Sequence, residues 1–154
     1  MWALQNADRN QEAVLIAEEA LNLDEFGNSE YLRNGLAACL MRLGRIEEAV
    51  IQYEHNAQHG NSTTQTLAWG KLANLYDILG QIENRDEAVT QSFDNALKTQ
   101  VPFAQIRAGI AVLKFGSQAQ LEQILPLVLG KKSPDPNAQA ELEAALESRG
   151  ISLA

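Results

Sequence analysis

A glycine-terminated apolar stretch recurs at a fixed spacing and constrains the fold more than any other feature of the chain. In its clearest copy, AWGKLANLYDILG at residues 68–80, apolar side chains fall at i, i+3, i+4 and i+7, which is one face of an α-helix. Gly80 then ends the helix, because glycine adopts left-handed backbone angles without a steric penalty. Gly44 and Gly116 lie 36 residues to either side and follow similar apolar runs. The repetition predicts a series of similar helical units.

Aligning the three copies places a small residue at the same point in each one, namely Ala37, Ala73 and Gly109. We expect this residue to let two helices approach closely, so that each unit is a pair of antiparallel helices. One pair cannot bury its apolar face alone, so successive pairs must stack. No segment alternates apolar and polar residues for long, and we therefore expect no strands.

Capping residues and breakers set the expected helix boundaries. The expected helices are 2–7, 11–23, 29–43, 46–59, 62–79, 87–97, 102–115, 118–129 and 136–149. The expected caps are Ser62 or Thr63, Asn84 with Glu87, Ser117 with Gln120, and Asp135 before a first-turn Pro136, while Pro102 also starts a helix. Asn6–Asn10 is expected to break the first helix, and Gly27-Asn28 to end the first unit. We also expect a long turn at 81–87, and a kink or early end at Pro126.

Composition and charge exclude several classes of function. The 154-residue chain has 20 acidic and 12 basic residues and a net charge of −8, which disfavours a general nucleic-acid binder. Its one cysteine, Cys39, cannot form an internal disulfide and is expected to be a small core or groove residue. No apolar run has the ~18–20 residues of a membrane span, and we read no targeting signal, so a cytoplasmic location is expected.

The repeat resembles the tetratricopeptide repeat, whose pattern is W-x2-L-G-x2-Y, then A-x3-F and later P. The matching positions are Trp69, Leu72, Ala73 in place of Gly, and Tyr76, with Ala49-x3-Tyr53 as the second-helix element and Pro134 near the end of the last unit. The resemblance covers roughly residues 1–134. The period of 36 residues is longer than the usual ~34, which could change the superhelical twist.

This resemblance implies an all-α fold, a right-handed α–α superhelix of stacked antiparallel helix pairs with a C-terminal capping helix. We expect a single domain over residues 1–154. Its parts would be a partial repeat at 1–28, repeats at 29–62, 63–100 and 101–134, and the capping helix at 135–150.

In proteins of this family the inner helices line a concave groove that binds a peptide or another protein. By register, the groove candidates here are Tyr31, Asn34, Met41, Arg42, Asn74, Asp77, Phe103, Ile106, Ile110, Leu113 and Lys114. The apolar stripe on the last inner helix favours an amphipathic helix or an extended apolar segment as the guest. The alternative is that the terminal helix, or a second copy of the chain, covers this stripe.

No motif of the sequence indicates catalysis, a cofactor or a phosphate-binding loop. His55 and His59, spaced i and i+4, are the best metal candidates, because this spacing can hold zinc if two further ligands converge. The alternative is that they are two exposed imidazoles in the last turn of a helix, where partial positive charge is favourable.

Three function hypotheses follow, of which a metal-dependent enzyme that uses His55 and His59 is the least favoured. The leading one is a non-catalytic interaction module or scaffold that binds a peptide or partner helix in its groove. The alternative is an oligomerisation or regulatory segment of a larger enzyme, because the truncated first pair would leave Trp2, Leu4 and the Val14/Ile16 face open at an edge.

Overall fold

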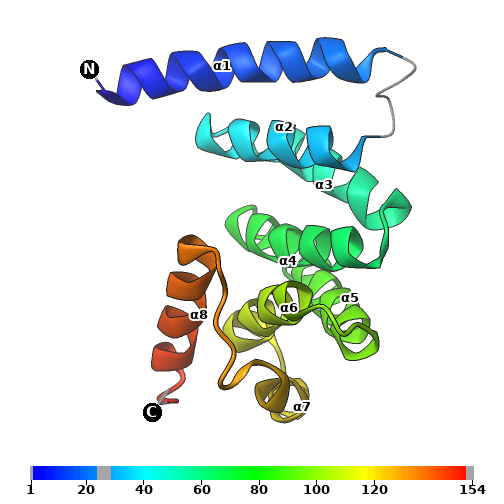
Figure 1. The fold of residues 1–154 in the computed structure, drawn as a ribbon, viewed down its shortest axis with the longest axis vertical. Helices are drawn as coiled ribbons and strands as arrows, with labels where there is room; N and C mark the ends of the chain where they lie inside the picture. The colour runs from blue at the N-terminus through cyan, green and yellow to red at the C-terminus, as the bar shows by residue number, and fades with distance from the viewer. Residues whose placement is uncertain (1, 24–28, 152–154) are drawn as a thin grey trace. The chain divides into compact units, whose positions relative to one another are not determined.

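The described part of the chain is built from helices (Figure 1). The computed structural model describes the backbone of residues 2–23 and 29–151, and the side chains of those residues from residue 9 onward. No strand occurs in these ranges, so the predicted all-α class is confirmed. The helices are α1 (Trp2–Leu21), α2 (Glu30–Arg42), α3 (Ile46–His59), α4 (Ser62–Ile78), α5 (Ile82–Lys98), α6 (Pro102–Phe115), α7 (Gln118–Val128) and α8 (Pro136–Ser148).

The helices form two compact units, unit 1 (Met1–Gly60) and unit 2 (Asn61–Ala154). In unit 1, α1 packs against α2 and α2 against α3 (Figure 1). The buried Asn56 of α3 links these last two helices, because its Nδ2 donates to the Glu30 carbonyl at 3.1 Å and to Asn34 Oδ1 at 2.8 Å. The unit-1 core includes Val14, Leu36, Ala37, Leu40, Ala49 and Tyr53.

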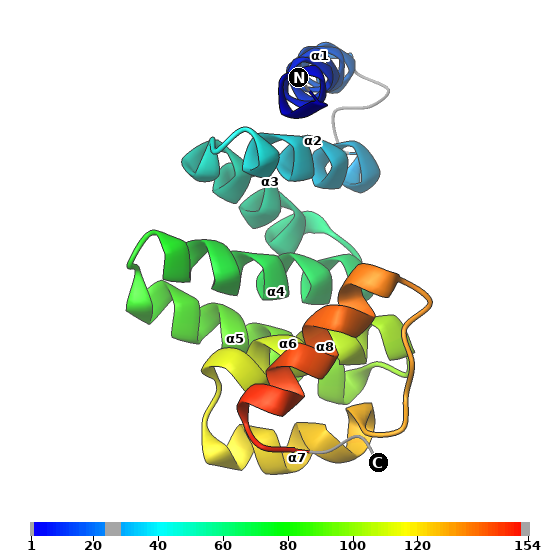
Figure 2. The ribbon, with the colours of Figure 1, turned by 90° about the vertical axis from the view of Figure 1, so that its left-hand side faces the viewer.

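In unit 2, α4 packs against α5 and α6 against α7, and the two pairs meet through α4–α6, α5–α6 and α5–α7 contacts. The last helix, α8, lies against α6 (Figure 2). The core of this unit includes Leu72, Leu75, Val89, Val112, Ile124, Leu142 and Leu146. A single stacked array that joins both units, as the sequence suggests, stays a prediction.

The repeated glycines end their helices in two different ways. Gly44 and Gly80 have φ of 76° and 73°, and the amide after each one donates back into its helix, as in Gln81 N to Tyr76 O at 2.8 Å. Gly116 instead has an extended backbone, with φ of −76° and ψ of 168°. A Cβ on Gly116 would lie 2.8 Å from the Val112 carbonyl oxygen. The third glycine is therefore needed for close packing rather than for a left-handed turn.

The polar residues at 6–10 do not break the first helix, contrary to prediction. α1 runs continuously from Trp2 to Leu21. The segment contains no glycine or proline, and its Asn, Asp and Arg residues each lower helix stability by no more than about 0.7 kcal/mol relative to alanine. The predicted end at Gly27-Asn28 lies outside the described residues.

The extra residues at 81–87 lengthen a helix and do not form a long turn. α5 begins at Ile82 and has 17 residues, against 14 in its counterpart α3. Asn84 is therefore inside the helix, where its Nδ2 donates to Gln81 Oε1, and the predicted capping box with Glu87 is wrong. The left-handed Gly80 already reverses the chain, and no helix breaker follows it.

Most of the other predicted helix starts are confirmed. Ser117 and Gln120 form a reciprocal capping box, Asp135 caps α8 through Asn137 N, and Pro102 and Pro136 occupy first-turn positions. The cap of α4 is an exception, since Asn61 rather than Ser62 or Thr63 accepts from Thr64 N at 2.9 Å. α7 ends at Val128, two residues after Pro126.

Candidate functional site

An apolar pocket opens between α1 and α2 in unit 1, and we call it the α1–α2 pocket. Its volume is about 580 Å³. It is lined by Ala13, Ile16, Ala17, Tyr31, Leu32, Asn34, Gly35, Leu36 and Cys39. Ile16 and Tyr31 are 67% and 86% exposed, so these two large residues leave much of their surface open to solvent at the pocket. The structure thus leaves an apolar concavity accessible to another molecule.

Small residues on both helices create this pocket. Ala13 and Ala17 lie on α1, and Gly35 lies on α2. A Cβ built on Gly35 would meet no atom within 4 Å, so nothing fills the space that this glycine leaves. The half-buried Cys39, a free thiol, lines the same space, as expected for a groove residue.

Two of the predicted groove residues of α2 belong to this pocket and two do not. Tyr31 and Asn34 line it, and Asn34 is held in place by the hydrogen bond from Asn56. Met41 is half-buried and Arg42 is exposed, and neither is among the lining residues.

The predicted apolar stripe of α6 is largely inaccessible in unit 2. Ile106, Ile110 and Leu113 are buried, and Phe103 is half-buried. The sequence left open whether this stripe binds a guest or is covered by the terminal helix or a second copy of the chain. In the structure the terminal helix, α8, packs against α6. We therefore do not include these three buried residues in a binding surface.

Arg107 is the main polar link between α6 and α8. Its side chain is only 10% exposed, and it pairs with Asp135 at 3.4 Å and Glu141 at 3.3 Å. At the other end of α8, Arg149 Nε donates to the Leu113 carbonyl at 2.7 Å. These contacts hold α8 along α6 at both ends.

The polar groove candidates of unit 2 are engaged with neighbouring side chains. Lys114 Nζ donates to Asn74 Oδ1 at 3.2 Å, and Asp77 pairs with Arg85 at 2.9 Å. Lys71, which the sequence did not single out, is half-buried nearby. Burial and the Arg107 charge lower the pKa of Lys71, and Lys114 adds to this effect, while Glu141 and Asp135 oppose it.

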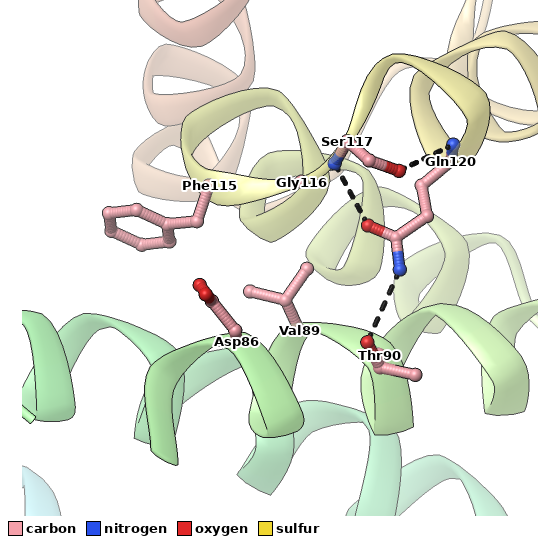
Figure 3. Close-up of a pocket in the computed structure, with 7 residues that line it drawn as sticks. All are labelled: Asp86, Val89, Thr90, Phe115, Gly116, Ser117 and Gln120. Carbon is pink, nitrogen blue, oxygen red and sulfur yellow. Dashed lines mark hydrogen bonds between the residues drawn. The ribbon is translucent and has the colours of Figure 1, made fainter. Parts of the chain in front are cut away.

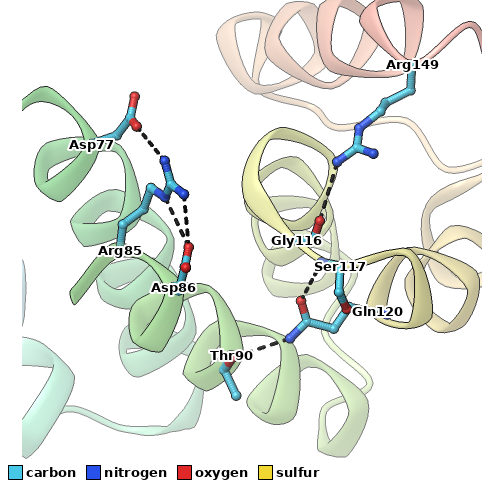
Figure 4. Close-up of polar contacts among 8 residues, drawn as sticks. All are labelled: Asp77, Arg85, Asp86, Thr90, Gly116, Ser117, Gln120 and Arg149. Atoms are coloured by element: carbon cyan, nitrogen blue, oxygen red, sulfur yellow. Dashed lines mark hydrogen bonds and ion pairs between the residues drawn. The ribbon is translucent and has the colours of Figure 1, made fainter. Parts of the chain in front are cut away.

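A second pocket, of about 340 Å³, lies between α5 and the α6–α7 connection (Figure 3). Gln120 spans it, since its Oε1 accepts from Ser117 N at 3.0 Å and its Nε2 donates to Thr90 Oγ1 at 3.3 Å (Figure 4). At its other side Asp86 pairs with Arg85, which lies 5.0 Å from the centroid of the Phe115 ring. The polar groups of this pocket thus bind one another, and we assign it a structural role.

The histidine pair lies on α3 with ring centroids 4.7 Å apart. His55 and His59 line a pocket of about 470 Å³ with Glu30 and Asn56. Burial is the main cause that lowers the pKa of His55, followed by the charges of Arg33 and His59. Among the described residues, no three His, Cys, Asp or Glu side chains converge in a way that could hold a metal ion.

Gly35 as a pocket-forming residue and Lys71 as a half-buried cation were not predicted from the sequence. A helical glycine that ends no helix is the signal that could have identified Gly35. Lys71 gave no such signal, because its environment is formed by α6 and α8, which are distant in sequence.

No helix in the described ranges combines the length and apolarity needed to cross a bilayer. Comparison of the chain with protein families, curated proteins and solved structures gave no match.

Proposed function

We propose that this chain is a non-catalytic protein-interaction module that binds an apolar segment of a partner in the α1–α2 pocket. The observation that carries the proposal is the open pocket of about 580 Å³ flanked by the exposed Ile16 and Tyr31. An amphipathic helix binds such a site by inserting side chains from one face. Burying one partner leucine would contribute roughly 1.5–3 kcal/mol.

We further propose that the helix pairs belong to one tetratricopeptide-like array, a right-handed superhelix over the whole chain. The order of contacts within unit 2 supports this, because α4 packs against both α5 and α6, and α6 against α7. The left-handed glycines after α2 and α4 support it as well, since they close equivalent helices in the same way.

The binding function is tested by titrating the whole chain into a fluorescent, amphipathic helical peptide that carries leucines on one face. Fluorescence anisotropy then measures the affinity of the chain for the peptide. Gly35→Leu should fill the pocket and weaken binding at least about tenfold, which is about 1.4 kcal/mol. It should not unfold unit 1, because a Cβ there meets nothing within 4 Å and leucine exceeds glycine in helix propensity by roughly 0.8 kcal/mol.

Ile51→Asp is the matched control, because Ile51 is an exposed aliphatic residue of unit 1 that does not line the pocket. It should leave peptide binding unchanged, whereas Ile16→Asp should weaken it. If the wild-type chain binds no such peptide, or if Gly35→Leu binds it as well as wild type, the proposal is wrong.

Self-association is the second candidate function, and the exposed Ile16 favours it. The sequence predicted that both Val14 and Ile16 would lie open at the edge of the first helix pair. This is wrong for Val14, which is fully buried, whereas Ile16 is exposed. The side chains of Trp2 and Leu4 lie outside the described residues. Light scattering should then show a concentration-dependent dimer that Ile16→Asp disrupts and Ile51→Asp does not. A monomer at all concentrations would exclude this function.

A further inference from the structure

Two acidic side chains lie beside the exposed Ile16 at the rim of the α1–α2 pocket. Glu12 precedes Ile16 by four residues and Glu19 follows it by three on the continuous helix α1, so all three share one helix face. Both glutamates are exposed, and neither forms an ion pair within the part of the chain that the structure describes. This edge of the pocket therefore combines an apolar side chain with two carboxylates.

The arginines of unit 1 offset these carboxylates only in part. Arg33 Nη1 donates to a glutamine of α3 at 2.8 Å, and Arg45 pairs with Glu48 at 2.5 Å. The other two, Arg9 and Arg42, are exposed, and each lies one helical turn from a residue that lines the pocket. They are the cations that a basic guest would meet, and they give the test below a variant of opposite sign.

The net negative charge of the chain is concentrated in the unit that holds the pocket. Unit 1 has ten acidic and four basic residues, which is a net charge of −6 with neutral histidines. Unit 2 has ten acidic and eight basic residues, a net charge of −2. A positively charged molecule that approaches unit 1 is therefore attracted over a distance of about one Debye length, roughly 10 Å at 0.1 M salt.

We propose that the guest of the α1–α2 pocket is a basic amphipathic helix. Its apolar side chains enter the pocket, and its lysine or arginine side chains meet Glu12 and Glu19. This inference rests on the binding function proposed above and adds the charge of the partner to it. Apolar burial supplies the affinity, while charge complementarity selects the partner and speeds the encounter. A second copy of the chain fits less well, because its own unit 1 would bring a further net charge of −6.

The test compares two fluorescent helical peptides that share one leucine face and carry either lysine or glutamate at every polar position. Both residues are good helix formers, so the peptides differ mainly in charge. Anisotropy titrations with the whole chain are made at about 0.1 M and about 1 M salt, where the Debye length is roughly 10 and 3 Å. The lysine peptide should bind at least about fivefold more tightly at the lower salt, and within about twofold of the glutamate peptide at the higher salt.

Charge variants then locate the effect at the pocket. The double variant Glu12→Gln, Glu19→Gln should weaken binding of the lysine peptide several-fold and strengthen binding of the glutamate peptide. Glu83→Gln with Glu147→Gln is the matched control, because it removes two exposed carboxylates of unit 2 and changes the net charge equally. This control should leave both affinities nearly unchanged. Arg42→Gln should act in the opposite direction and strengthen binding of the lysine peptide.

The outcomes separate this inference from the binding function on which it rests. Equal affinities of the two peptides at about 0.1 M salt, with both weakened by Gly35→Leu, would overturn the basic guest and leave the binding function standing. If neither peptide binds, both proposals are wrong. Binding of the lysine peptide that Gly35→Leu does not weaken would show attraction outside the pocket and contradict both. A dimer that excludes the lysine peptide would make a second copy of the chain the occupant.

Discussion

Replacing Gly109 by alanine should destabilise unit 2, although alanine is the better helix former. A Cβ at this position would lie 2.6 Å from Val128 Cγ1, and 3.5 and 3.6 Å from the other two carbons of that side chain. Val128 is fully buried, and its β-branched side chain has few alternative rotamers. Overpacking of a core typically lowers stability by about 1–3 kcal/mol, whereas replacing glycine in a helix gains roughly 0.8–1 kcal/mol. We expect a net loss of about 1 kcal/mol.

Gly70→Ala is the matched control, because Gly70 is also a buried helix glycine of unit 2. Its added Cβ would meet Arg107 O at 3.6 Å and Ser92 Oγ at 3.8 Å, which are ordinary contacts. This variant should therefore gain up to about 1 kcal/mol from helix propensity. Adding Val128→Ala to Gly109→Ala should remove the overlap, so the double variant should be more stable than the sum of the two single changes predicts.

The assay is urea unfolding followed by circular dichroism and by the fluorescence of Trp69, in a Trp2→Phe background so that the signal reports α4. A shift of the midpoint at constant m-value measures the change in stability. If Gly109→Ala is as stable as wild type, the α6–α7 contact is looser than the structure indicates. The packing argument would then be refuted.

Three further predictions concern pH and helix ends. The pKa of His55 is lowered in the folded chain, so unit 1 should lose stability as the pH falls from the unfolded pKa near 6.5 through the folded pKa; His55→Gln should reduce this dependence in urea titrations at pH 5 to 7.5. Gly80→Ala should lower the thermal midpoint, because the φ of 73° is strained by about 1–2 kcal/mol in residues with a Cβ. Ser117→Ala should destabilise the start of α7 by about 0.5–2 kcal/mol, and unchanged amide exchange at Gln120 would contradict this.

The helices were predictable because their signals are local. The boundaries of α3 and α6 match the expected 46–59 and 102–115, since glycine, proline and apolar spacing act within a few residues. The errors occurred where the local signal was ambiguous. Asn84 is a residue type that favours helix caps, but Gly80, four residues earlier, had already determined where α5 begins.

The candidate sites were less predictable because they depend on distant pairs. The Arg107–Glu141 and Arg107–Asp135 contacts join residues that are 34 and 28 positions apart. Repeat register placed an apolar stripe on α6 but left open whether a partner, the terminal helix or a second copy of the chain would cover it. Tyr31 and Asn34, which were predicted as groove residues, line the α1–α2 pocket, but the pocket itself depends on α1, for which the sequence predicted a break.

The two hydrogen bonds of the Gln120 amide give α7 an unusual dependence on α5. One bond closes the first turn of α7, and the other reaches Thr90 on α5 (Figure 4). Losing the α5 contact would free the amide that also caps the turn, so fraying of α7 and its separation from α5 become a single event. The first-turn amides of α7 should accordingly show the hydrogen-exchange protection of a packed interior segment rather than that of a helix end.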